Sequence, residues 1–399
     1  MRKTAPEPDL LTATLTGSAR DFERLEAKWN DLYRHSENAT PFQSWGWLFS
    51  WWQTYAPDPS RKLALLSLRE RSSGLLLGVF PMMIKRSLGG VGVLSLIGDG
   101  VTDYLDVVVR SGWEREVFEA GARAVQRIPG WTVGDFRQLR PEASVFGALE
   151  KLDRRPERLR EEGYPRIVAP DWEAAVRGAG KNLRSMARRS VKRLAADGVE
   201  RVCVPPDTPP GQIADAARRF VALHREYWRD RNISPEHLTG RFANHIVLSA
   251  GRMVPEGGME IREFRLKGEV IASQVIMVGD GYAGQMLSGA GAEAAKRYQL
   301  SSLFIYDGFK VSERVGAAGF DLLRGEEAYK LRWNPEVVPG TRAVFGRNDM
   351  LRRGYLASVK AYAALREQAH AGDASPGVKR LFAAYTDLRS RFARLRNRG

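Results

Sequence analysis

The segment 316–333, GAAGFDLLRGEEAYKLRW, holds the densest group of side chains that could do chemistry. A short apolar run ends at Gly325, and Glu326, Tyr329 and Lys330 follow it closely. A glutamate where a strand ends can hold or deprotonate an ammonium group, and a tyrosine can protonate a leaving thiolate. Lys330 could neutralise a phosphate or a carboxylate. We therefore predict a catalytic group here, with a solvated turn as the alternative.

A predicted helix before this segment could hold an anionic group. It begins at Gln299, Leu300, Ser301 and Ser302, after a stretch that contains several glycines. The first N–H groups of a helix point outward and bind phosphates, and glycines allow close approach to the backbone. We predict that these four residues bind the phosphates of an activated donor. The alternative is an ordinary helix start.

A histidine and a group of polar residues add further candidates. His224 lies at helical spacing from Phe220 and Trp228, where it is either catalytic or a hydrogen-bonded core residue. Asp103 and Asp106 flank a predicted strand start and fall on opposite faces by strand alternation. They are therefore predicted to contact substrate rather than to form a carboxylate pair, unless the segment is a simple turn. The five histidines show no metal-ligand spacing, so no metal site is expected.

Two clusters of like residues have more than one interpretation. Residues 181–193 carry six positive charges and no acid. Their cations fall on one helical face, which is either solvated or binds an anion, and Arg184 is predicted to point inward. The aromatic segment 42–52 contains four tryptophans. It is interpreted as a core that wedges the two halves together, rather than as a platform for a sugar or a base.

The predicted elements that position these residues occur twice in the same order. Each half reads as a helix, a meander of three strands, a second helix and a strand, which indicates a tandem duplication with a mixed α/β sheet. The predicted helices are 19–35, 112–128, 213–228 and 299–315. The predicted strands are 63–69, 75–84, 91–97, 104–109, 131–139, 260–266, 270–278, 282–288 and 320–323. The segment 151–162 is read as a break between the halves, and the chain after Pro339 as helical.

Length and composition limit the classes of protein. The chain has 399 residues and 43% hydrophobic residues, enough for two domains, which we place at 10–165 and 166–345, followed by a basic helical segment, 346–399. One cysteine, Cys203, excludes a disulfide framework. No signal peptide or membrane-spanning run is read, so a cytoplasmic protein is expected. The net charge of +15 favours an anionic partner, and the basic residues 379–398 could contact a membrane surface.

The chain resembles the CelD-like, or BioF2-like, branch of the GNAT acyltransferases, over roughly residues 20–345. The specific match is the ending G-x-x-x-F-D-x-x-x-G-x-x-x-Y-K-x-x-W, which is residues 316–333 here. Supporting matches are the aromatic opening 41–52, the strand GVFPM at 78–82, the segment 98–106 and the basic helix 171–194. The family usually has Ser-Pro-Gly where this chain reads Tyr298-Gln299-Leu300-Ser301.

The resemblance implies two tandem GNAT-like domains that transfer an acyl group. Acyl-CoA, with acetyl-CoA first, is the implied donor, and the implied acceptor is an amine or hydroxyl of a sugar or cell-envelope precursor. Catalysis would fall to Glu326, Tyr329, Lys330 and His224, and donor binding to the residues at 299–302. The implied substrate contacts are Asp103, Tyr104, Asp106, Arg184, Gln274 and Trp333.

Two other functions stay open at this point. The related FemAB-type transferases take their acyl group from aminoacyl-tRNA, and the high positive charge agrees with such a donor. The missing Ser-Pro-Gly turn slightly favours this alternative. A non-catalytic binding module that keeps the tandem fold is the third possibility. The acceptor, the acyl group, the half that binds the donor and the oligomeric state are not fixed by the sequence.

Overall fold

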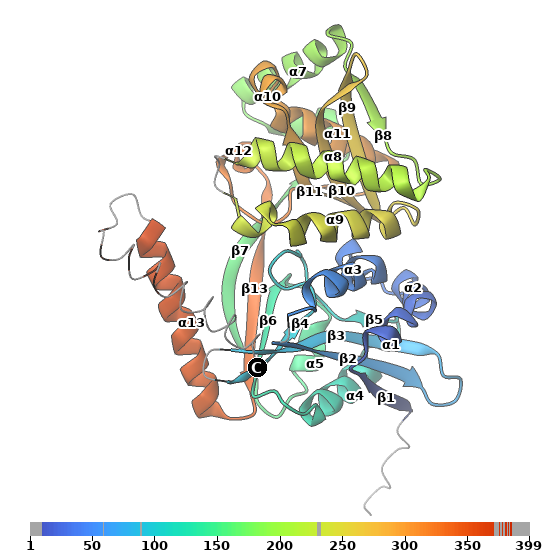
Figure 1. Cartoon of the computed structure of the whole chain (residues 1–399), viewed down its shortest axis with the longest axis vertical. Helices are drawn as coiled ribbons and strands as arrows, with labels where there is room; N and C mark the ends of the chain where they lie inside the picture. Colours follow the sequence, from blue (N-terminus) through green and yellow to red (C-terminus); the bar gives the residue numbers. More distant parts are fainter. Residues whose placement is uncertain are drawn as a thin grey trace, which may run out of the picture.

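The computed structural model describes residues 10–58, 60–87, 90–229 and 233–370, together with five single positions between 375 and 384. The predictions for residues 1–9 and for the basic stretch 379–398 fall outside the described residues, apart from three single positions. One mixed sheet of 13 strands runs through both halves, with helices packed on its faces (Figure 1). None of the helices in the described part combines the length and the apolar character needed to cross a lipid bilayer.

The first half contains the meander and the two helical layers that the sequence predicts. Its strands are β1 (Leu11–Thr16), β2 (Arg61–Glu70), β3 (Leu76–Arg86), β4 (Gly92–Leu96), β5 (Val108–Val109) and β6 (Val133–Leu139). Its helices are α1 (Ala19–Glu23), α2 (Glu26–Arg34), α3 (Trp45–Tyr55), α4 (Glu114–Arg127) and α5 (Val145–Leu149), with a 3₁₀ turn at Pro41–Gln43. The predicted β2–β3 hairpin is confirmed, and Gly74 adopts a positive φ in its turn.

The second half repeats this plan. Its strands are β7 (Glu157–Val168), β8 (Glu200–Cys203), β9 (Met259–Leu266), β10 (Glu269–Gly279), β11 (Tyr282–Ala290), β12 (Gly319–Asp321) and β13 (Glu336–Gly346). Its helices are α6 (Trp172–Gly178), α7 (Lys181–Ala196), α8 (Pro210–Trp228), α9 (Gly240–Met253), α10 (Ala292–Arg297), α11 (Leu300–Arg314), α12 (Ala328–Leu331) and α13 (Asp349–His370), with a 3₁₀ turn at Pro235–Leu238. Lys267 and Gly268 both have positive φ in the β9–β10 turn, as two-residue hairpins require.

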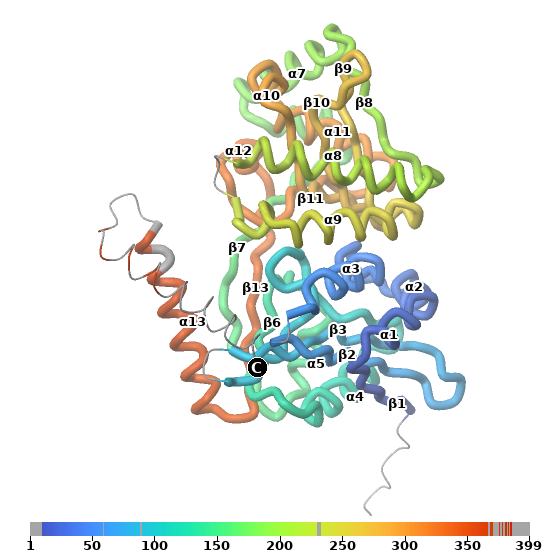
Figure 2. The backbone as a smooth tube through the Cα atoms, in the orientation of Figure 1, coloured from blue at the N-terminus to red at the C-terminus, as the bar shows by residue number. Residues whose placement is uncertain are grey.

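Two long strands join the halves into one sheet. The strand order is β1-β2-β3-β4-β6-β13-β7-β12-β11-β10-β9-β8, with β5 on β3. β13 pairs with β6 of the first half and with β7, while β7 pairs with β12 of the second half. Figure 2 shows β7 and β13 running together between the lower and upper parts of the molecule. The last strand of the chain therefore lies in the middle of the sheet.

Three predicted elements are wrong. The segment after Pro339 is not helical at first, because β13 runs to Gly346 and Pro339 sits at a register shift in its pairing with β7, where a missing N–H is tolerated. The segment 151–162 is not only a break, since β7 begins at Glu157. Most of the predicted strand 104–109 is irregular, and only Val108–Val109 pairs.

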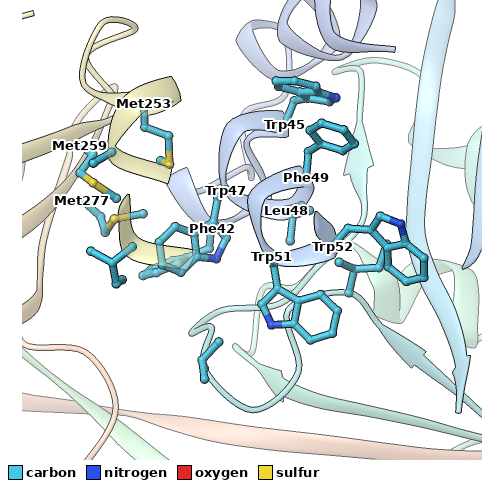
Figure 3. Packing of buried hydrophobic residues seen from close by; sticks show 14 of the residues in the cluster. Phe42, Trp45, Trp47, Leu48, Phe49, Trp51, Trp52, Met253, Met259 and Met277 are labelled. Atoms are coloured by element: carbon cyan, nitrogen blue, oxygen red, sulfur yellow. The ribbon is translucent and has the colours of Figure 1, made fainter. Parts of the chain in front are cut away.

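The aromatic segment forms the wedge that the sequence predicts. Trp47 and Trp51 are fully buried on α3, and Phe42 packs edge-on against Trp47. Helix α3 packs on α9 of the second half, where the ring of Trp47 lies 4.3 Å from that of His245. Figure 3 shows Met253, Met259 and Met277 of the second half beside this aromatic group. The shared core holds the two halves in one fixed relation.

Candidate active site

A large cleft of about 2220 Å³ lies where the two halves meet. Its first wall comes from the second half: the ends of α8 and β11, the 3₁₀ turn at Pro235–Leu238, the loop after β12 and α12. Its second wall comes from β3, β4, β6 and β13, closed on the outer side by α13. Figure 1 shows α13 leaning along β7 and β13 at this side of the molecule. Residues of both domains therefore face one volume.

The first wall opens where two parallel strands separate. β11 and β12 pair at one position only, Gly284 with Asp321. The following residues of both strands, 285–288 and 322–324, line the cleft instead of continuing the ladder. Gly289 keeps α8 close to this edge, because a Cβ there would lie 2.3 Å from the backbone nitrogen of His224. The separated strands and α8 thus form one corner of the cleft.

His224 presents an unused ring nitrogen in this corner. Its side chain is fully buried, and Nδ1 lies 2.8 Å from the carbonyl oxygen of Ser288. A carbonyl oxygen only accepts hydrogen bonds, so Nδ1 carries the proton and Nε2 keeps its lone pair. Nε2 has no partner within the described residues, although the ring lines the cleft. Burial lowers the pKa of His224 to about 4, so the imidazole is neutral at pH 7.

A second histidine, which the sequence reasoning missed, lines the cleft beside the first. The ring centroid of His237 lies 5.7 Å from that of His224, and its ring stacks on Phe242 at 4.4 Å. Burial, followed by the neighbouring His224, lowers the pKa of His237 to about 3. Its Nδ1 also has no partner in the described part of the chain. The sequence gives no signal for it, because His237 stands in an irregular segment without periodicity.

The loop after β12 brings a charged pair from both halves to the cleft. Arg324 lies 3.4 Å from Asp103 of the first half, and both line the cleft. Burial raises the pKa of Asp103, and Arg324 opposes that rise. Leu323 and Gly325 both have positive φ, which is unusual for leucine. Such strained backbone is often kept at functional sites.

The predicted catalytic residues of this loop have different surroundings. Tyr329 lines the cleft, and burial raises its pKa, so its hydroxyl stays protonated. Glu326 also lines the cleft, and its Oε1 accepts a hydrogen bond from the backbone N–H of Gly163 at 3.2 Å. Lys330 is nearly buried, donates to the carbonyl oxygen of Arg324 at 2.8 Å and pairs with Glu327 at 3.0 Å. Its geometry is that of a residue that holds the loop in place.

The remaining predicted substrate contacts do not all face the cleft. Tyr104 is buried with positive φ, and its hydroxyl donates to Asp321 at 2.8 Å. Asp106 accepts backbone N–H groups of Val107, Ser144 and Val145 at 2.7–2.8 Å, which is a structural role. These N–H groups oppose burial, which raises the pKa of Asp106 to about 6.

Three further predicted residues lie in cores or at helix ends. Trp333 is 2% exposed and packs on Trp172. Gln274 is fully buried and donates to Asp307 at 3.1 Å. Arg184 donates to the carbonyl oxygens of Arg177 and Ala179, so it does turn inward, but toward the end of α6. None of the three lines the cleft.

The predicted donor-phosphate residues 299–302 lie away from the cleft. Leu300 and Ser302 are buried at the start of α11, which packs against α7. The preceding residues, Arg297 and Tyr298, both donate to Asp197 at the end of α7, at 2.8 and 2.9 Å. Asp197 forms an ion pair with Arg297 at 2.7 Å, so the arginine that precedes the helix start is already paired.

The bases that line the cleft are largely neutralised. Lys85 pairs with Asp99, Arg324 with Asp103 and Arg342 with Asp135. The excess positive charge of the chain must therefore lie mostly outside the cleft. Within the described ranges, no group of three or more His, Cys, Asp and Glu side chains could hold a metal ion.

Comparison with known proteins finds one matching domain model and several similar folds. Residues 181–331 match the family model described as Acetyltransferase (GNAT) domain. The chain is similar to the crystal structure of FemX, with 10% identity, a TM-score of 0.56 and coverage of 86% of this chain and 99% of that chain. It is similar to L-PGS from Bacillus licheniformis, with 14% identity, a TM-score of 0.53 and coverage of 84% and 95%. Among curated proteins, none matches.

The family model covers most of the second half, and the two structures share the arrangement of both halves. At these sequence identities, the two structures indicate a similar fold and nothing about function. The corner formed by α8, β11 and β12 lies within the matched segment. Residues 181–331 are therefore similar to a GNAT acetyltransferase domain, within an α/β fold of two halves that repeat one order of elements and are followed by a helical C-terminal segment.

Proposed function

We propose that this chain is an acyltransferase of the CelD-like, BioF2-like branch of the GNAT superfamily. It moves an acyl group, with acetyl-CoA as the first candidate donor, to an amine or hydroxyl of a sugar or cell-envelope precursor, as in exopolysaccharide synthesis. The domains are those placed at 10–165 and 166–345, with 346–399 as an appended segment. The observation that carries the proposal is the buried, unpartnered Nε2 of His224 in the cleft corner where β11 and β12 separate.

The corner offers each group that acyl transfer needs. The lone pair of His224 accepts a hydrogen bond from the acceptor amine or hydroxyl and orients it toward the donor carbonyl. The guanidinium of Arg324, which lines the cleft, stabilises the oxyanion that develops on that carbonyl. Tyr329, kept protonated by burial, donates a proton to the leaving thiolate. Holding donor and acceptor together in one cleft supplies much of the rate acceleration.

Titration calorimetry with CoA and acetyl-CoA tests the donor. We expect binding that is lost when the cleft corner is filled by Ser288→Trp and kept when an exposed surface serine is replaced, as in Ser185→Trp. Mass spectrometry of small molecules that co-purify with the chain is an independent check. If CoA shows no binding at millimolar concentration and no CoA species co-purifies, the acyl-CoA donor is ruled out.

A second candidate function is transfer of an aminoacyl group from aminoacyl-tRNA, as a FemAB-type enzyme would carry out. Two observations favour it. The start of α11 follows Tyr298, which is bonded to Asp197, and it does not line the cleft. Helix α7 exposes cations that no carboxylate neutralises in the described part of the chain. These cations are Lys181, Arg189 and Lys192. Filter binding of tRNA over a salt series decides the question, because phosphate contacts give a steep salt dependence. Absent or salt-independent binding removes this candidate.

A further inference from the structure

The cleft continues from the transfer corner into a separate space under α13, here called the α13 compartment. Its floor comes from β3, β4, β6 and β13, and its roof is the inner face of α13. The floor contributes Lys85, Ser95, Asp99 and Gln138, and the roof contributes Tyr355, Ser358 and Tyr362. None of these residues belongs to the corner around His224, so a ligand in the compartment would contact a different set of side chains.

The charges of the α13 compartment already satisfy one another. Asp135 accepts two hydrogen bonds from Arg342, both at 2.6 Å, and one from the hydroxyl of Tyr355 at 2.6 Å. Asp99 pairs with Lys85, and Arg137 donates to Glu161 at 2.8 Å. A phosphate entering here would have to displace a carboxylate from one of these pairs, and each lost charge-assisted bond is costly. The compartment is thus suited to an uncharged ligand.

Two residues of the compartment floor, Gln138 and Asp99, have a buried side-chain oxygen without a hydrogen-bond partner among the described residues, and of the two only Asp99 is held in an ion pair, with Lys85. The side chain of Gln138 is 2% exposed and lines the cleft, and the oxygen without a partner is its Oε1. A buried carbonyl group without a hydrogen-bond partner destabilises the fold, because it has lost its hydrogen bonds to water. An occupant that donates a hydrogen bond to Oε1 would remove this destabilisation.

The backbone of Gln138 is built to turn this side chain into the compartment. Residues 137 and 138 form a bulge in β6 opposite Arg342 of β13, and Gln138 has a φ of 55°. Its N–H donates to Glu161 at 2.6 Å, and its carbonyl oxygen accepts from Leu105 at 3.0 Å. Bulges redirect side chains, and a positive φ is unusual for glutamine. Backbone strain and an unpartnered amide oxygen at one buried position indicate a binding role.

We propose that the α13 compartment binds the non-reacting part of the acceptor, and that this part is an uncharged glycan. This inference rests on the proposed acyl transfer, which places the reacting group of the acceptor in the adjoining corner. Sugar hydroxyls donate to Gln138 and exchange hydrogen bonds with the serines that line the floor and the roof. The rings of Tyr355 and Tyr362 offer apolar area to the sugar faces. A nucleotide-linked sugar fits this compartment less well, because its phosphates would have to displace a carboxylate from one of the ion pairs.

Binding to the full chain can be measured without any transfer. The probes are a panel of neutral oligosaccharides of three to five gluco-, galacto- and manno-configured units, an N-acetylated tetraglycine amide, and UDP-N-acetylglucosamine. Ser358→Trp fills the compartment from the exposed roof, and Ala357→Trp, one residue away on α13 and outside the cleft, is its matched control. Gln138→Leu removes the unpartnered oxygen.

We expect at least one neutral oligosaccharide to bind, with affinity at least tenfold weaker for Ser358→Trp, about tenfold weaker for Gln138→Leu and unchanged for Ala357→Trp. The inference is overturned if no oligosaccharide binds at a probe concentration of about 10 mM, because a weaker affinity would not be useful. It is also overturned if the peptide or UDP-N-acetylglucosamine binds more tightly, or if Ser358→Trp has no effect. If a glycan binds but no acyl transfer is detected, the proposed function is wrong, and the assignment of the α13 compartment to a glycan still holds.

Discussion

At the scale of single residues, His224 carries the chemical hypothesis, because its proton is fixed on Nδ1, its Nε2 has no partner among the described residues, and the residue lines the cleft. Replacing it by asparagine should lower kcat by about 10²–10⁴-fold, the usual contribution of such a group. His245 is an equally buried histidine that does not line the cleft. His245→Asn should therefore affect stability and leave kcat nearly unchanged. Equal kcat losses in both variants would remove His224 from the mechanism.

The buried histidines also make stability depend on pH. Burial lowers the pKa of His224 to about 4 and those of His237 and His245 to about 3. The histidines of an unfolded chain have pKa values of about 6.5. Between the pKa values of the folded chain and this value, the unfolded chain therefore binds more protons than the folded chain. The free energy of unfolding is therefore highest above pH 6.5 and falls as the pH drops toward 4. The pKa of Asp106 is raised to about 6, so its contribution to the free energy of unfolding changes with pH in the opposite direction. It offsets part of the contribution of one histidine.

Urea unfolding at pH 7 and pH 5 measures this effect. His245 alone should account for a fall of about 2 kcal/mol between these two pH values. Between pH 7 and pH 5, the free energy of unfolding of His245→Asn should therefore fall by about 2 kcal/mol less than that of the parent chain. This difference does not depend on the stability of the variant at pH 7. Equal falls in the parent chain and the variant would mean that His245 is already protonated or exposed in the folded state.

At the scale of elements, the contact between α3 and α9 fixes the two halves. Gly46 of α3 lies against α9, and a Cβ there would come 3.0 Å from Met253 Cγ and 3.1 Å from Arg252 Cβ. Gly46→Ala should destabilise the fold by about 1–3 kcal/mol through overpacking. Gly251 of α9 has open space where its Cβ would be, so Gly251→Ala should stabilise by about 0.5–1 kcal/mol through helix propensity. Thermal unfolding of both variants tests the interface, and a stable Gly46→Ala would show that α3 and α9 can separate slightly.

The elements that repeat in both halves were predictable because they follow local patterns. The hairpins, the amphipathic helices and the aromatic wedge each have a periodicity or a turn that identifies them. β13 was not predictable, because its partners β6 and β7 lie about two hundred residues upstream and Pro339 reads as a breaker. Strand pairing over such distances leaves no local signal.

The candidate site was predictable only in part, for the same reason. Tyr329 is a fixed position of the ending at 316–333 on which the resemblance rests, Glu326 stands within that ending, and both line the cleft. His237 and Gln138 line it as well, but a lone histidine in an irregular segment and a glutamine within a strand have no motif. Their roles come from tertiary placement: one stacks on Phe242, and the other turns at a bulge. The residues 299–302 mark the opposite case, where a helix start has a local pattern but lies outside the cleft.

At the scale of the whole molecule, the shared sheet makes the last strand essential to both halves. β13 pairs with β6 on one side and with β7 on the other, so its removal leaves one edge of each of these two central strands unpaired. A chain that stops after Asn334 should therefore fail to fold and should accumulate as insoluble protein. The failure should affect the first half as well as the second, because β6 belongs to the first.

A chain that stops after Asn348 is the matched comparison, since it keeps β13 and loses α13. Helix α13 packs through Leu356 on Val133 and Val344, and through the bonds of Tyr355 to Asp135 and of Arg352 to Glu157. Its loss should cost about 2–5 kcal/mol for the buried leucine, and it should also open the α13 compartment. This shorter chain should stay folded by circular dichroism, with a lower Tm and no glycan binding. If the chain ending at Asn334 is equally folded, the two halves are independent, and the continuous sheet does not hold the cleft together.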